Sequence, residues 1–309
     1  MLVGAHVSTA GGLVKAHERG VEMDADAIQI FNQSPRMWRP TKYKDPDIAE
    51  FRARMKDGPI RSVVIHAVYL INVASDREDV RRNSIASLKH ALQVGDAIGA
   101  DGVVFHPGSR KTGELEPALD LIGKSIREVL AESERTPLLL ENTAGAGGTI
   151  GRTFEELADL LERGGGGKRL GVCLDCCHLL ASGYDIRTAD KLTKVLDEAA
   201  SAFDFGRVGC IHVNDSQAPL GSNRDRHADL PEGELGTRGL SAYLSEPRFE
   251  GLPALLEVNG PGGHGPDAEQ VAIAKRLRAR GLGARKRAKA RSGGRRQPGR
   301  PAASRRSRG

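Results

Sequence analysis

The chain has 309 residues, of which 39% are hydrophobic and 28% are charged, and its formal net charge is +6. No apolar run reaches the roughly 18 residues that a membrane-spanning helix needs, and the N-terminal segment lacks the basic stretch, apolar core and cleavage site of a signal peptide. We therefore expect a soluble, cytoplasmic protein that has no membrane partner.

Eight short apolar runs follow one another along the chain, and six of them end at a residue that can bind a metal. The first two runs are LVGAHV, which contains His6, and AIQIF, which is followed by Asn32. The next six are SVVI, GVVF, PLLL, LGVCL, VGCI and PALL, and they are followed directly by His66, His106, Glu141, Asp175, His212 and Glu257. A strand of a parallel sheet is buried on both faces and reads as a continuous hydrophobic stretch, so these runs predict eight parallel strands.

Helical patterns lie between the runs. Residues 46–57, 76–99, 115–134 and 153–164 each show apolar residues three and four positions apart, and Thr153 with Glu156 has the spacing of a capping box. The alternation of strand, loop and helix is typical of α/β proteins of the barrel type. The predicted fold is a (β/α)8 TIM barrel of parallel strands that forms one domain over residues 1–280.

The C-terminal segment differs in composition from the rest of the chain. Residues 276–309 carry 14 Lys and Arg and no Asp or Glu, so the preceding residues carry 32 basic against 40 acidic side chains. The segment is poor in large apolar residues, and we expect residues 281–309 to form a disordered basic tail. Such a tail attracts polyanions by releasing counterions, which favours contact with nucleic acid; a solubilising appendage is the alternative.

The metal-binding residues at the strand ends should meet at one end of the barrel, because the carboxyl ends of all strands surround a common mouth. A single histidine at a strand end is more often a structural residue. Here, however, six strands in succession end at a residue type that can bind a metal, and the buried carboxylates among them need a cation. Together these observations favour a metal site. Three further candidates flank the six, namely His178, Asp225 and His227. Mixed imidazole and carboxylate ligands suit zinc, with manganese or iron as alternatives.

The four cysteines are Cys173, Cys176, Cys177 and Cys210, and they lie in or beside two predicted strands. This placement does not suggest the disulfide framework of a secreted protein. Cys173 and Cys176 have the spacing of a redox or zinc motif, but we expect no helix N-terminus there to activate a redox pair. We interpret all four cysteines as packing residues.

Six segments resemble the signature stretches of the endonuclease IV family, the zinc-dependent endonucleases that cut DNA at abasic sites. They are, in chain order, GAHVSTAGGL, HAVYLIN, FHPGS, ENTAG, GVCLDCCHLLASGYD and HVNDSQAPLGSNRDRH. The resemblance covers roughly residues 1–280 and implies three zinc ions per chain. One ion would be held by His66, His106 and Glu141, a second by Glu141, Asp175, His212 and Glu257, and a third by His178, Asp225 and His227.

The resemblance also implies a DNA-repair reaction and its substrate. The family hydrolyses the phosphodiester 5′ to an abasic site in duplex DNA, leaving a 3′-hydroxyl and a 5′-deoxyribose phosphate, and Glu141, which would bridge two ions, is the implied catalytic residue. The positions that match the family's minor-groove side chains are Arg36, Tyr69 and Leu70, for which loop packing is the alternative. Arg224 and Arg226, beside the third ligand group, are candidate phosphate contacts. We expect a monomer.

The sequence departs from the family pattern at Met37, where a polar residue is common, at Pro231, which replaces a glycine, and in the basic tail. Two other functions stay open. A metal-dependent sugar isomerase or epimerase of the same barrel type would need one or two ions, which would leave His178, Asp225 and His227 without a metal. A non-catalytic DNA-binding protein recruited by its tail would bind an abasic duplex without cutting it.

Overall fold

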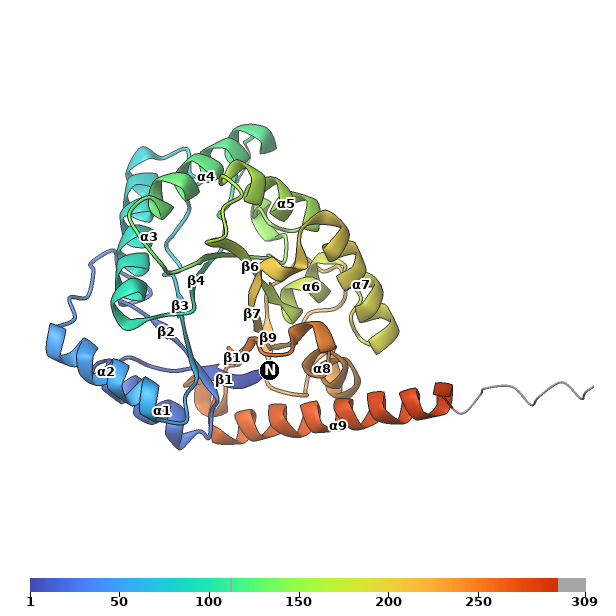
Figure 1. Cartoon of the computed structure of the whole chain (residues 1–309). Helices are drawn as coiled ribbons and strands as arrows, with labels where there is room; N and C mark the ends of the chain where they lie inside the picture. Colours follow the sequence, from blue (N-terminus) through green and yellow to red (C-terminus); the bar gives the residue numbers. More distant parts are fainter. Residues whose placement is uncertain (112, 294–309) are drawn as a thin grey trace, which may run out of the picture.

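Eight parallel strands form a closed barrel in the computed structural model, which describes residues 1–111 and 113–293 (Figure 1). The strands are β1 (Leu2–His6), β2 (Ala27–Phe31), β3 (Ser62–His66), β4 (Gly102–Phe105), β5 (Leu138–Glu141), β6 (Leu170–Asp175), β7 (Val208–His212) and β10 (Pro253–Leu256). Each strand pairs with its neighbours in sequence order, and β1 closes the ring by pairing with β10. The predicted TIM barrel is confirmed, with all eight apolar runs as its strands.

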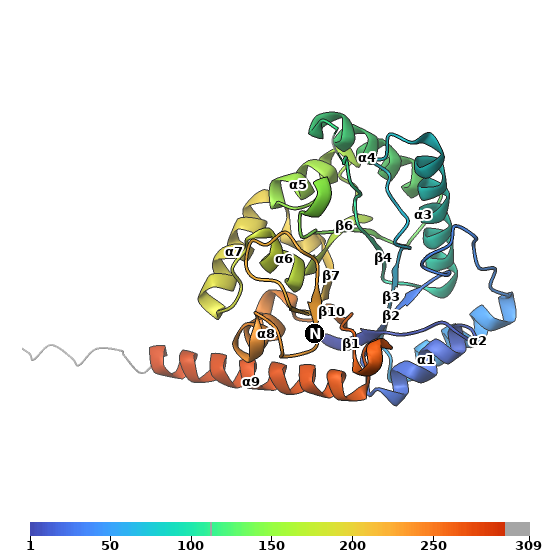
Figure 2. The same ribbon diagram turned by 180° about the vertical axis from the view of Figure 1, so that it is seen from behind.

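Helices surround the strands in both views of the molecule (Figure 2). They are α1 (Leu13–Glu22), α2 (Asp45–Asp57), α3 (Glu78–Ile98), α4 (Leu115–Leu130), α5 (Phe154–Arg163), α6 (Cys176–Ser182), α7 (Ala189–Ala202), α8 (Gly236–Leu244) and α9 (Ala268–Gly293). The four predicted helices are α2 to α5. Thr153 caps α5 as the sequence predicted, since its hydroxyl accepts a hydrogen bond from the Glu156 backbone N–H. Within the described residues, no helix is long and apolar enough to cross a membrane.

Shorter elements complete the connections. In the described part of the chain, 3₁₀ turns lie at Ala146–Gly148, Phe205–Arg207, Pro247–Phe249 and Pro261–Gly263. A small antiparallel pair, β8 (Asp215–Ser216) and β9 (His227–Ala228), follows β7. This pair folds the long β7–α8 loop back toward the strand ends, which places the residues around His227 near the barrel mouth.

The interior of the barrel is filled in layers. One apolar layer takes a residue from each of seven strands: Ala27, Val64, Val104, Leu139, Cys173, Cys210 and Leu255. Because side chains alternate between the two faces of a strand, the residue two positions further along points into the barrel again, one layer closer to the mouth. In six of these seven strands that residue is a predicted metal ligand. The apolar layer is thus the floor beneath the candidate site.

Helix α9 corrects the boundary expected at residue 280. The helix continues without a break to Gly293, so residues 281–293 are helical and the expectation of disorder is wrong for them. Gly281 packs so closely on the Ser241 carbonyl of α8 that a side chain would not fit, and Arg285 forms an ion pair with Glu246 at 2.8 Å. Alanine, arginine and lysine are also strong helix formers, a preference that outweighed the low apolar content here. Residues 294–309 of the predicted tail lie outside the described residues.

Candidate metal centre

Nine predicted ligands lie together at the barrel mouth and form three groups. Within each group the candidate ligand atoms lie within 4.8 Å of one another. The groups are His66, His106 and Glu141; Glu141, Asp175, His212 and Glu257; and His178, Asp225 and His227. Glu141 belongs to two of them, which is the arrangement that a bridging carboxylate requires.

Glu141 lies at the centre of the mouth and is completely buried. Its Oε2 is 3.2 Å from Nε2 of His66 and 3.4 Å from Nε2 of His106. Its Oε1 is 3.0 Å from Nδ1 of His212 and 3.2 Å from Nδ1 of His178. The two carboxylate oxygens therefore face different pairs of histidines, so each oxygen can serve a different ion.

The third group takes His178 from helix α6, and Asp225 and His227 from the segment at the start of β9. Asp175 ends β6 and caps α6, because its side chain accepts a hydrogen bond from the His178 backbone N–H. His178 Nε2 lies 3.3 Å from one oxygen of Asp225, and His227 Nε2 lies 3.2 Å from the other. Neither buried nitrogen makes a hydrogen bond with a described residue. Two buried imidazole nitrogens thus face one carboxylate without forming hydrogen bonds to it. This arrangement suits a cation bound between the three groups.

The carboxylates and imidazoles of the mouth shift one another's pKa values. Burial raises the pKa of Glu141, but His106 and His212 lower it more, so this pKa lies well below its usual range. Burial lowers the pKa of His212, but Glu257 and Glu141 raise it to about 10. Burial lowers the pKa of His227, but the adjacent carboxylate of Asp225 and the charge of Asp175 raise it to about 9. The buried carboxylates therefore require compensating positive charge. Either protonated histidines or bound metal ions can supply this charge.

Two asparagines that the sequence analysis did not single out fix the orientation of Asp175 and Glu257. Asn214 Nδ2 donates to Asp175 Oδ2 at 2.6 Å, and Asn214 Oδ1 accepts from the Glu257 backbone N–H. Asn142 Oδ1 accepts from the Asp175 backbone N–H at 2.6 Å. Asn142 directly follows Glu141 in ENTAG, and Asn214 stands two positions after His212 in HVNDSQAPLGSNRDRH, so their position in these motifs was the signal that could have revealed them.

The candidate DNA-contacting residues lie around the ligand groups and are exposed. Tyr69 is 66% exposed, and with Arg36 it lines a cleft of about 790 Å³ that reaches Glu257. Leu70 lines a smaller cleft beside His106, of about 300 Å³. A third cleft, of about 740 Å³, is lined by Arg224, Asp225 and Arg226. Since open clefts and not packed loops surround these side chains, they are free to meet a large ligand.

Two of the departures from the family pattern lie outside the ligand groups. Met37 is 52% exposed on the same loop as Arg36. Pro231 follows a cis peptide bond after Leu230, in the loop that leads from β9 to α8. Neither residue removes a candidate ligand.

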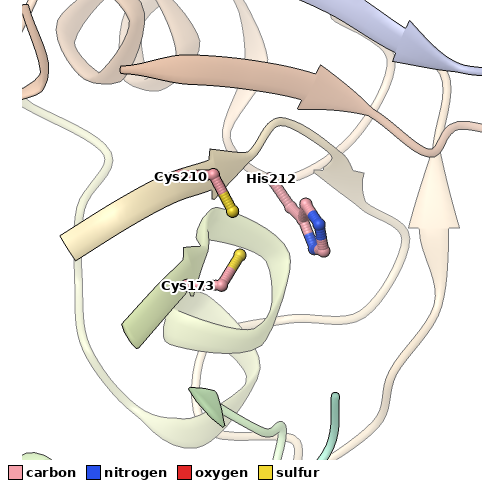
Figure 3. Close-up of side chains that lie close together, drawn as sticks. All are labelled: Cys173, Cys210 and His212. Carbon is pink, nitrogen blue, oxygen red and sulfur yellow. The ribbon is translucent and has the colours of Figure 1, made fainter. Parts of the chain in front are cut away.

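Cys173 and Cys210 belong to the apolar layer of the barrel, and their sulfurs face each other beside His212 (Figure 3). All four cysteines are free and buried. The expectation that no helix begins at the Cys173–Cys176 motif is wrong, because α6 starts at Cys176. Even so, burial raises the pKa of both thiols well above the usual value, and Cys176 Sγ donates to the Asn214 carbonyl. Neutral thiols with packing and hydrogen-bond partners support the structural interpretation.

Comparison with known proteins assigns the chain to a family. Residues 18–280 match the family model described as xylose isomerase-like TIM barrel. The chain is 38% identical to a probable endonuclease 4 of Halothermothrix orenii over 89% of its own length and 100% of the relative, and 38% identical to that of Chloroflexus aggregans over 82% and 90%.

Solved structures agree with this assignment. The crystal structure of endonuclease IV from Thermus thermophilus is 37% identical and superposes with a TM-score of 0.77, covering 91% of this chain and 98% of that one. A D-tagatose 3-epimerase-like protein, 19% identical with a TM-score of 0.67, shares the fold alone. The chain therefore belongs to the endonuclease IV family, within the xylose isomerase-like TIM barrels.

Proposed function

We propose that this protein is a DNA-repair endonuclease that hydrolyses the phosphodiester 5′ to abasic sites in duplex DNA with three zinc ions. The products would be a 3′-hydroxyl and a 5′-deoxyribose phosphate. Membership of the endonuclease IV family supports the reaction class. The single observation that carries the proposal is the position of Glu141, whose two oxygens face separate pairs of histidines at the centre of the barrel mouth.

The chain's own residues would hold the ions and leave one side open to the substrate. When bound, the ions would activate water at neutral pH and neutralise charge on the scissile phosphate. Glu141 would bridge two ions, Asp175 and Glu257 would be held in place by Asn214, and His178 with Asp225 and His227 would hold the third ion. Zinc suits this mixture of nitrogen and oxygen donors, and manganese or iron are alternatives at individual positions.

Recognition of the lesion would come from the rim. Arg36, Tyr69 and Leu70 would enter the minor groove, and Arg224 and Arg226 would bind phosphates. Extruding a nucleotide costs least where its base is already missing, since no pairing and little stacking are lost. The exposure of Tyr69 and its position at the edge of the cleft that reaches Glu257 support this role.

The other two functions fit the mouth less well. A sugar isomerase or epimerase with one or two ions would leave His178, Asp225 and His227 without a purpose, although the three lie together at the mouth. A DNA-binding protein without catalysis would have no need of nine assembled ligands. A cytoplasmic location and a monomeric state stay predictions from the sequence.

The deciding experiment uses a labelled duplex with one tetrahydrofuran abasic analogue, and the same duplex without the lesion as control. Purified protein should nick only the first duplex, immediately 5′ to the analogue, and prior chelation should stop the reaction. Elemental analysis should find three metal ions per chain. A protein that holds one or two ions and does not nick the duplex would support the isomerase, and one that holds three ions and only binds the duplex would support the non-catalytic alternative.

A further inference from the structure

Gln29 is a polar residue in the middle of β2, a strand that supplies no predicted ligand. It stands two positions after Ala27 of the apolar layer, so its side chain enters the layer of the barrel that holds the metal-binding residues. The side chain is completely buried. Because a buried amide needs partners for both its oxygen and its nitrogen, the partners of Gln29 indicate its role.

Both ends of the Gln29 amide contact the ligand group that contains Asp175, His212 and Glu257. Gln29 Nε2 donates to Glu257 Oε1 at 2.7 Å, and Gln29 Oε1 is 2.9 Å from His212 Nε2. The same Nε2 lies 3.2 Å from Nδ1 of His6, on the adjacent strand β1. One side chain thus connects two predicted ligands of one ion, contributed by β7 and β10.

The Glu257 carboxylate determines which way round the amide lies. A carboxylate that binds a metal is ionised and can only accept hydrogen bonds, so the NH₂ of Gln29 must face it. Gln29 Oε1 then faces His212, and because this oxygen only accepts, His212 Nε2 must carry a hydrogen. The lone pair of His212 is left on Nδ1, which lies 3.0 Å from Glu141 Oε1 and 3.1 Å from Glu257 Oε2.

We propose that Gln29 is a positioning residue that holds His212 in the Nε2–H tautomer and directs its Nδ1, together with the Glu257 carboxylate, at one shared ion. Partners of this kind orient ligands and typically change metal affinity 10- to 100-fold. No hydrogen bond joins Gln29 to His66, His106 or the third group within the described residues. Only one of the three ions should therefore depend on Gln29, and the inference rests on the proposed metal centre.

The first test measures stepwise zinc affinities by competition with a chromophoric chelator. Gln29→Met keeps the volume of the side chain and removes its hydrogen bonds, and it should weaken one zinc site by about 10- to 100-fold while leaving the others unchanged. The control is Thr136→Val, which removes a similarly buried hydrogen bond, to Asp96, before the start of β5 and away from the mouth. Equal zinc affinities in Gln29→Met and wild type would overturn the inference.

A second measurement uses the unaltered protein and does not depend on whether a variant folds. Long-range ¹H–¹⁵N spectra of zinc-loaded, histidine-labelled protein should show that His212 carries its hydrogen on Nε2 and binds through Nδ1. A His212 that binds through Nε2 would contradict the role of Gln29 while leaving the metal centre intact. A wild-type protein that binds no zinc would instead refute the proposed function, so the two failures can be told apart.

Discussion

Glu141→Gln is the substitution that most directly tests how the metal centre works. Glutamine has nearly the same size as glutamate, so the completely buried site is not emptied. The substitution removes the one negative charge that lies 3.0–3.4 Å from nitrogens of four histidines, and it places an NH₂ where one of two ions would need an oxygen.

The expected loss follows from the number of ions that share Glu141. Removing a hydrogen-bond partner of a metal ligand lowers the metal affinity by up to about 100-fold. Removing the ligand itself should lower the metal affinity by at least as much, which corresponds to about 2.7 kcal/mol per ion. Two ions share Glu141, so cleavage that needs both should fall by about 10⁴-fold or more, which corresponds to about 5.4 kcal/mol. Affinity for the duplex should stay close to that of the wild type, because the exposed arginines and Tyr69 are unchanged.

The assay compares nicking of the abasic-analogue duplex, duplex affinity by fluorescence anisotropy after chelation, and metal content. Glu246→Gln is the matched control, since Glu246 is also buried but pairs with Arg248 and Arg285 away from the mouth. The control should cut DNA at the wild-type rate. Retention of both full cleavage and three ions in Glu141→Gln would refute the bridging role.

Three further predictions concern the rim, the tail and the fold. Tyr69→Ala should lower affinity for the abasic duplex by about tenfold, within the usual range for an aromatic side chain on nucleic acid, and leave affinity for intact duplex unchanged; equal losses for both would argue against insertion. Residues 294–309 contain six arginines, so their removal should reduce the slope of log affinity against log salt concentration by up to about 5, while the position of the cleaved bond stays the same. An unchanged slope would show that the tail does not contact DNA. Asp96 accepts hydrogen bonds from Ser133, Glu134, Arg135 and Thr136, so Asp96→Ala should lower the free energy of unfolding by about 2–3 kcal/mol in denaturant titrations. Burial raises the pKa of Asp96, but these hydrogen bonds lower it by more, so the folded pKa lies below the unfolded value of about 3.9. The stabilisation by Asp96 is therefore complete above the unfolded pKa and is lost as the pH falls from there through the lower folded pKa. A difference in stability between Asp96→Ala and wild type that stays the same in acid would contradict this.

Several features of this protein could be predicted from local sequence patterns. A strand buried on both faces must be apolar, and a side chain must alternate between faces, so a polar residue after each apolar run is directed to the barrel mouth. This is why the strand ends, the six ligand candidates that follow the apolar runs and the barrel fold could be predicted from the sequence. Each of these patterns extends over only a few consecutive residues, so it can be recognised in the sequence without the tertiary structure.

Other features depend on closure of the barrel and could not be predicted from the sequence. Gln29 appeared as one polar residue in the run AIQIF, yet its partner Glu257 is 228 residues away and comes within 2.7 Å only because β1 joins β10 to β2. The composition of the C-terminal segment predicted that the ordered domain ends near residue 280, although α9 packs through Gly281 on α8 and continues to Gly293. The residue types and their spacing thus follow from local physical chemistry, whereas the choice of hydrogen-bond partner at the mouth follows from distances that only the closed tertiary structure sets.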